Sequence, residues 1–120
     1  MKHLLFTAGM LVGGWLMAAH ATQPVARDWS IGEDAQSFVW VPEKAWLSEA
    51  CASTKKCQAY SALQDKVKLE ASMLNGRNPA SAVCKEKWKA KVVIARHGDE
   101  TQGFCVFADD SVASLGGLLK

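Results

Sequence analysis

The 120-residue chain lacks several features that would assign it to a functional class. Its 14 lysines and arginines are nearly balanced by 12 aspartates and glutamates, so it has no basic excess typical of nucleic-acid-binding proteins. It has no glycine-rich phosphate loop and no D-x-D-x-D-G calcium loop. Its longest apolar run, residues 4–17, is shorter than the ~20 residues that span a bilayer. We therefore expect no nucleic-acid partner and no transmembrane segment in the mature chain.

The N-terminus has the pattern of a secretory signal. Lys2 and His3 precede the apolar run, and Ala19-His20-Ala21 supplies the A-x-A pattern that signal peptidase recognises. An uncleaved membrane anchor is the alternative, and no cysteine follows the run to carry a lipid. We expect residues 1–21 to be a cleaved signal peptide and the protein to be exported, to the periplasm or beyond it.

Residues 22–120 are poor in large aliphatic side chains. Ile, Leu, Val and Phe make up only about a fifth of them, which is close to the lower limit for a self-sufficient core. Four tryptophans add apolar bulk: Trp29, Trp40, Trp46 and Trp88. A domain of this composition would benefit from covalent cross-links.

Four cysteines can supply these cross-links, and in an exported chain an even number predicts disulfides. They are Cys51, Cys57, Cys84 and Cys105. Three pairings are possible, and we favour Cys51–Cys57 with Cys84–Cys105. The first bond needs a break in any helix over 51–57, because helical geometry would hold the two Cα atoms too far apart. A zinc site is the alternative, but the spacing lacks the paired C-x₂₋₄-C units of structural zinc sites.

The first half of the mature chain predicts mainly helix. Residues 22–41 are expected to form an extended lead-in with a short strand at 38–41, and residues 42–120 a single small domain. Pro42-Glu43 is typical of a helix start. Apolar side chains then recur at helical spacing towards a stop at Asn75-Gly76: Tyr60, Leu63, Val67 and Leu74.

The second half predicts a short helix and then strands. Asn78 can cap a helix that begins at Pro79. Strands are expected at 91–96 and 104–108, separated by a turn at 97–100, and a further strand follows Asp109-Asp110. The order predicts an α+β fold, in which an N-terminal helical hairpin-like unit precedes a short helix and a small antiparallel β-meander. No internal repeat is visible.

Residues 76–112 resemble a family of small bacterial exported proteins and lipoproteins of unknown function, often labelled "putative hemolysin". The resemblance rests on Asn78-Pro79-Ala80-Ser81, on Cys84 three residues later, and on Gly103-Phe104-Cys105-Val106-Phe107-Ala108-Asp109. Lys85–Lys89 replaces the family's glycine pair, and Asp110 stands where glycine is usual. The resemblance implies an exported, disulfide-bearing domain. The mature chain shows no membrane-inserting segment to support the label.

Candidate catalytic groups are few. His97 is the single histidine after residue 21, and a nucleophilic pair with Cys105 would require an unbridged thiol. The acidic pairs Asp99-Glu100 and Asp109-Asp110 fall in expected turns, where carboxylates are ordinarily solvated. We therefore expect no enzyme, no cofactor and no metal site.

Lys85, Lys87, Lys89 and Lys91 alternate along the chain. If this stretch is extended, all four lie on one face, which could bind an anionic envelope component or an acidic protein. A soluble face that discourages strand pairing is the alternative.

These observations favour a small exported, non-catalytic binding protein of unknown partner, either an inhibitor or an envelope-associated factor. It would use the lysine face and the hairpin over 104–114. The alternative is an accessory component of an envelope or secretion machine, with residues 22–75 as its partner-binding helical unit. A thiol enzyme or metal site using Cys84, Cys105 and His97 is a third hypothesis.

Overall fold

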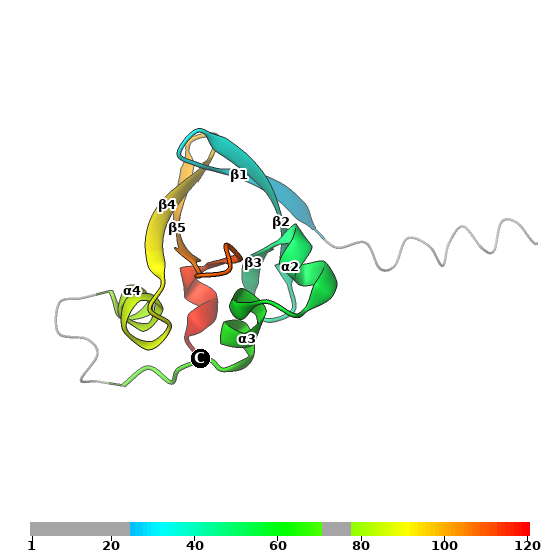
Figure 1. Ribbon diagram of the computed structural model, residues 1–120. Helices are drawn as coiled ribbons and strands as arrows, with labels where there is room; N and C mark the ends of the chain where they lie inside the picture. Colours follow the sequence, from blue (N-terminus) through cyan, green and yellow to red (C-terminus); the bar gives the residue numbers. More distant parts are fainter. Residues whose placement is uncertain (1–24, 71–77) are drawn as a thin grey trace, which may run out of the picture.

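A computed structural model describes residues 25–70 and 78–120, and its six strands close into an antiparallel β-barrel (Figure 1). The order around the barrel is β1-β2-β3-β6-β5-β4, in which β1–β3 and β4–β6 are two successive meanders. The strands are β1 (Ala26–Ile31), β2 (Asp34–Val41), β3 (Ala45–Ser48), β4 (Lys91–His97), β5 (Glu100–Val106) and β6 (Val112–Ser114).

The predicted helical hairpin followed by a meander was wrong. Pro42 does not start a helix: Lys44 adopts φ +64°, and the turn it closes brings Val41 opposite Ala45 in β3. The helix predicted from Pro42 onwards is replaced at Ala45–Ser48 by β3, which is buried on both faces and so lacks the polar-apolar alternation typical of a strand. Trp46 packs inside the barrel and Leu47 packs under the helices. The expected lead-in likewise supplies β1 and β2, two of the six strands.

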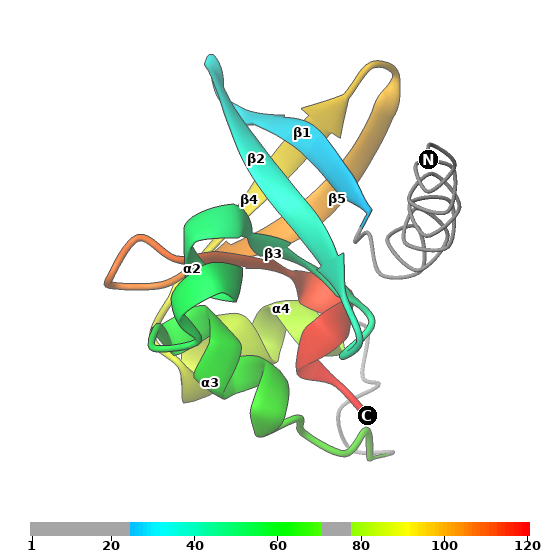
Figure 2. The same cartoon turned by 90° about the vertical axis from the view of Figure 1, so that its right-hand side faces the viewer.

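The helices are short and gather at one end of the barrel, opposite the tips of the β1–β2 and β4–β5 hairpins (Figure 2). They are α2 (Glu49–Thr54), α3 (Gln58–Gln64), α4 (Pro79–Ala82), the π-helical turn η3 (Val83–Lys87) and the 3₁₀ turn η4 (Leu115–Leu118). Together they cover the outer face of the β3–β6–β5 side, where a first apolar cluster includes Leu47, Leu63 and Leu118.

A second apolar cluster fills the barrel itself. Trp29, Phe38 and Phe104 are fully buried there, and their rings meet edge-on or tilted at centroid distances of 5.0–5.3 Å. Ala95 and Val112 lie in the same cluster. A chain with few aliphatic residues therefore builds two small cores, one inside the barrel from aromatic rings and one outside it under the helices.

The two meanders repeat each other, although the sequence shows no repeat. Every residue of β4–β6 except Lys91 has a counterpart numbered 66 lower in β1–β3. Phe38 pairs with Ser48 as Phe104 pairs with Ser114, and Trp40 pairs with Trp46 as Val106 pairs with Val112. The positive φ angles repeat too, at Gly32 (+65°) and Gly98 (+62°) and at Lys44 (+64°) and Asp110 (+69°).

Where the two halves meet, residues pair with their own counterparts. Leu47 pairs with Ala113 across β3 and β6, and Ser30 pairs with Arg96 across β1 and β4. A residue can lie opposite its own counterpart only where a two-fold axis passes between them. The barrel is therefore built from two half-barrels related by an internal pseudo-two-fold axis.

Both disulfides form as predicted. Cys51 bonds to Cys57 and Cys84 to Cys105, with Cα atoms 5.7 and 5.9 Å apart. The break that the first bond required is present, because α2 ends at Thr54 and Lys55 takes a left-handed conformation (φ +56°). Each disulfide lies within one half of the chain, and neither joins the two halves.

The predicted helix over the Tyr60–Leu74 stripe ends early, at Gln64. Val67 instead pairs in parallel with Leu119, donating its N–H to the Leu118 carbonyl at 2.9 Å. The Lys66 ammonium donates to the carbonyls of Glu43 (2.8 Å) and Gly117 (2.7 Å). These bonds outside a helix hold the chain along its C-terminal segment, and Leu74 and Asn75-Gly76 lie outside the described residues. So do residues 1–24, which include the expected signal peptide.

Candidate binding surface

The Asn78-Pro79-Ala80-Ser81 motif has a structural role. Asn78 caps α4 as expected, its side-chain oxygen accepting the Ser81 N–H at 3.1 Å, and Pro79 takes the first helical position. Ala80 is buried in the cluster under the helices. The motif thus fixes the turn that delivers Cys84 to Cys105, and it presents no reactive group.

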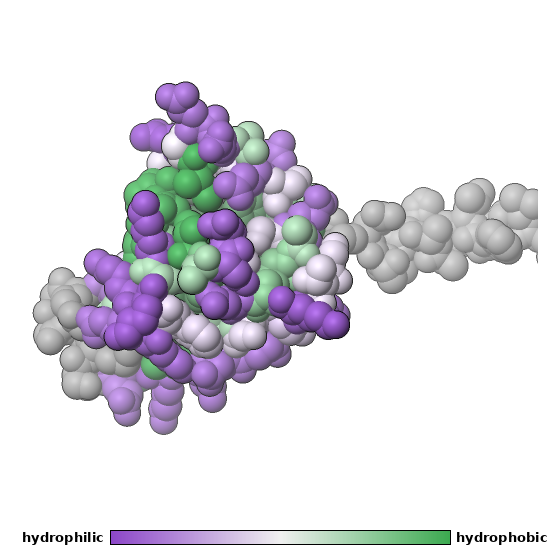
Figure 3. All heavy atoms as spheres, in the orientation of Figure 1, coloured by the Kyte–Doolittle hydropathy of each residue, from purple (hydrophilic) through white to green (hydrophobic). Residues whose placement is uncertain are grey.

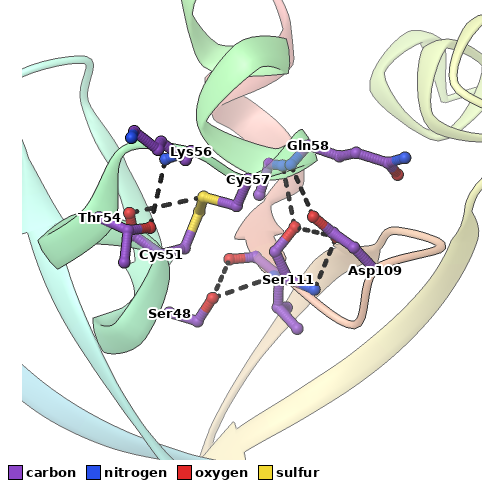
Figure 4. Close-up of a disulfide and its surroundings, with 10 residues drawn as sticks. Ser48, Cys51, Thr54, Lys56, Cys57, Gln58, Asp109 and Ser111 are labelled. Atoms are coloured by element: carbon purple, nitrogen blue, oxygen red, sulfur yellow. Dashed lines mark hydrogen bonds between the residues drawn. A yellow bond between two sulfur atoms is a disulfide. The ribbon is translucent and has the colours of Figure 1, made fainter.

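Asp109 also holds the fold together (Figure 4). One carboxylate oxygen accepts the Gln58 N–H at the start of α3 (2.9 Å), and the other accepts from the N–H and hydroxyl of Ser111 (3.0 and 2.5 Å). Burial would raise the pKa of Asp109, but the bonds from the Ser111 hydroxyl and from the Gln58 and Ser111 amides outweigh it and lower the pKa. Asp109 is therefore a carboxylate that anchors α3 to the β5–β6 turn.

Gly103 and Phe107 complete the structural part of the motif. A Cβ on Gly103 would lie 2.7 Å from Leu115 Cδ1, so glycine lets η4 approach β5 closely. Phe107 is buried, with its ring centroid 6.0 Å from that of Trp88. Since Phe104, Val112 and Ser114 are buried as well, the hairpin over 104–114 offers a partner little beyond its exposed turn at 108–110.

The four lysines do not share the face of a single strand. Lys85 and Lys87 lie in the π-helical turn η3, Lys89 takes a left-handed conformation (φ +53°), and only Lys91 belongs to β4. Lys87 forms an ion pair with Asp65 (2.9 Å) and lies 5.5 Å from the centre of the Trp88 ring. The premise of an extended stretch thus fails, although Lys85, Lys89 and Lys91 remain exposed.

Two of these lysines converge at the base of β4. Lys89 and Lys91 border one shallow hollow, which Phe107 and Asp110 help to line. Lys85 borders a different hollow beside Asn78 and Ser81. Within the described residues no carboxylate forms an ion pair with Lys89 or Lys91, so the two ammonium groups are available to an outside anion.

The fold leaves no free thiol that could act as a nucleophile. All four cysteines are bridged, and Cys105 is fully buried. His97 lies at the tip of β4, where its Nδ1 is 2.9 Å from the Asp28 carbonyl of β1. No cluster of metal-ligating side chains occurs among residues 25–70 and 78–120, and no helix in those ranges is long and apolar enough to cross a membrane.

The sequence analysis missed one feature of this surface. A strand was expected at 91–96, but nothing in the sequence indicated that one side of it is open to solvent. Ile94 is 60% exposed, the largest exposed fraction among the large apolar side chains of the described residues. Figure 3 shows apolar surface on the β4 side of the barrel, with hydrophilic side chains around it.

Comparison of the chain with protein-family models, curated proteins and solved structures returned no match. The resemblance of residues 76–112 to small exported proteins stays a prediction. The interpretation of this surface therefore depends on its own geometry and charge.

Proposed function

We propose that the chain is a small exported binding protein without catalytic activity, and that it contacts an acidic partner through the lysines beside β4. The observation that carries the proposal is the pair of exposed lysines, Lys89 and Lys91, which border one hollow at the base of β4, the strand that also exposes the apolar side chain of Ile94. Exposed positive charge and exposed apolar surface on one element are typical of recognition sites. Two disulfides support export, because such bonds persist mainly in oxidising compartments.

The alternative role in a larger machine placed the partner-binding surface on a helical unit within residues 22–75. The described helices of that region pack against the barrel, burying Ala59, Ala62 and Leu63. No apolar helix face within 25–70 is left for a partner, so this role has no structural observation in its favour.

Charge reversal tests the proposed surface. A variant with Lys85, Lys89 and Lys91 changed to Glu is compared with one in which the exposed Lys56, Lys68 and Lys120 are changed to Glu, so that the net charge is equal. Each is immobilised and incubated with an envelope extract of the source cells. We expect the parent and the control to recover the same partner and the first variant to lose it. Equal recovery by both variants would refute this surface.

Cleavage of the signal peptide and formation of both disulfides are tested by one measurement. The native protein is alkylated without reductant and its intact mass is determined. We expect the mass of Thr22–Lys120 with no alkyl group added. A mass that retains residues 1–21 would contradict cleavage, and an alkylated cysteine would revive the thiol hypothesis.

A further inference from the structure

The strand β4 has a neighbour on both sides along only part of its length. β5 accompanies all of β4, from the Lys91–Val106 pair to the His97–Glu100 pair. β1 pairs with β4 only at Ala95 and Arg96, because β1 ends at Ile31. No described strand therefore lies beside the outer edge of Lys91–Val93.

The backbone of this edge is oriented for pairing. Gly98-Asp99 is a two-residue hairpin loop, so the flanking pair His97–Glu100 is hydrogen-bonded and every second residue of β4 then directs its N–H and C=O away from β5. Arg96 is the first of these, and it pairs with Ser30 of β1. The next residues in this alternation are Ile94 and then Val92, so the N–H and C=O of Val92 face the open edge.

The pseudo-symmetry supplies an internal comparison. The equivalent edge of β1 contains Ala26 and Asp28, the counterparts of Val92 and Ile94. It is protected: the Asp28 carbonyl lies 2.9 Å from His97 Nδ1, and Asp28 itself places a carboxylate on the edge strand. The counterpart of His97 is Ile31, which cannot form such a bond. A charge on an edge strand is a known protection against strand pairing. The β1 edge has Arg27 and Asp28, whereas their counterparts in β4 are Val93 and Ile94, so the one charge on the open β4 edge is Lys91, which repels a basic strand and attracts an acidic one.

We propose that the Lys91–Ile94 edge of β4 binds an extended, acidic and apolar peptide segment of a partner protein by strand addition. The peptide backbone pairs with Val92, an apolar side chain packs on Ile94, and acidic side chains meet Lys89 and Lys91. Charge complementarity selects this occupant, since Lys89 and Lys91 lie at the N-terminal end of the edge and have no ion pair within the described chain. The inference deepens the proposed function and rests on it.

The probe is a fluorescent alternating Glu-Val heptapeptide, together with the same peptide N-methylated on alternate residues. N-methylation keeps the side chains and removes the N–H groups of one edge. Binding to residues 22–120 is measured by anisotropy and by amide NMR shifts. We expect the plain peptide to bind with shifts centred on Lys91–Ile94. The peptide methylated on the pairing edge should bind at least about tenfold more weakly than the plain peptide. This corresponds to a loss of about 1.4 kcal/mol or more of binding free energy.

Ile94→Asp copies the protection present on β1 and should weaken binding to a similar extent without unfolding the chain. Val25→Asp is the matched control, because Val25 is 59% exposed and immediately precedes β1. Thermal unfolding confirms that both variants are folded.

Equal affinity for plain and methylated peptides, or unchanged affinity of the Ile94→Asp variant, would overturn strand addition. If lysine reversal still abolished partner recovery, the proposed function would survive that result. If the parent protein is a dimer and the Ile94→Asp variant is a monomer, the edge pairs with a second copy of the chain. That result would refute the peptide partner.

Discussion

Ser48 and Ser114 make equivalent hydrogen bonds on opposite sides of the β3–β6 seam. The Ser114 hydroxyl accepts the N–H of Trp46 at 2.8 Å, and the Ser48 hydroxyl accepts the N–H of Val112 at 3.1 Å. Trp46 and Val112 are counterparts, as are the two serines. Since Leu47–Ala113 is the one strand pair at this seam, the serine hydroxyls complete the contact that closes the barrel.

The two serines should nevertheless differ in energetic weight. Ser114 is 2% exposed, whereas Ser48 is partly exposed. Ser114→Ala leaves the Trp46 N–H buried without a partner and should lower the free energy of unfolding by about 1–3 kcal/mol. Ser48→Ala should cost less than about 1 kcal/mol, because the bond between its hydroxyl and the Val112 N–H is only partly buried, whereas the Ser114 bond is buried. Urea unfolding of both variants measures the difference, and equal costs would contradict the role of burial.

Two glycines give a matched pair of packing tests. A Cβ at Gly117 would lie 2.5 Å from Ala45 Cβ, which is fixed to the backbone, whereas a Cβ at Gly103 would meet the flexible end of Leu115. We expect Gly117→Ala to lower the free energy of unfolding by about 1–3 kcal/mol, the usual cost of overpacking, and Gly103→Ala to cost clearly less. Thermal unfolding of the two variants decides, and the reverse order would contradict the packing at η4.

The free energy of unfolding should depend on pH through Asp109. Its pKa is lower in the folded chain than the ordinary value of about 3.9. The unfolded chain therefore binds the proton more readily, so the stabilisation is fully present above about pH 4 and is lost as the pH falls through the lowered pKa.

Unfolding free energies of the parent and of Asp109→Asn, measured from pH 2 to pH 7, test this dependence. We expect the parent's advantage at neutral pH to shrink in acid. Asp110→Asn is the control and should leave the profile unchanged, since Asp110 is exposed and its carboxylate forms no hydrogen bond or ion pair within the described residues. A constant difference between parent and Asp109→Asn would refute the linkage.

The larger disulfide loop should contribute more to stability. Replacing Cys84 and Cys105 by Ala removes a bridge between residues 21 positions apart, which costs about 3 kcal/mol in the chain-entropy model. The bridge between Cys51 and Cys57 spans 6 positions, and its loss should cost roughly 1 kcal/mol less. Denaturant titration of both double variants tests the order.

The sequence predicted the second half of the chain far better than the first. The Asn78 cap and the disulfide pairs were predicted, and the strands expected at 91–96 and after Asp109-Asp110 correspond to β4 and β6. Each has a local cause: a capping side chain, an even cysteine set, a turn between strands. β3 was missed because Trp46 and Leu47 are both buried, on opposite faces, which removes the polar-apolar alternation that identifies a strand.

The repeat was hidden for a different physical reason. Apart from the identical pair Phe38 and Phe104, the counterparts in the barrel interior are complementary in size: Trp29 corresponds to Ala95, and Trp46 to Val112. A large side chain on one half fills the space that a small one leaves on the other, so the shared backbone leaves little trace in the sequence. The open edge of β4 was equally hidden, because it depends on where β1 ends.

The disulfide pattern bears on how the chain acquires its covalent structure. Ribosomes and export channels both deliver a chain from its N-terminus, and here each cysteine bonds to the next one to emerge: Cys51 with Cys57, then Cys84 with Cys105. An oxidase acting on thiols in their order of arrival would make both native bonds directly. Maturation of this protein should therefore need a disulfide-forming catalyst and no isomerase to correct mispaired intermediates.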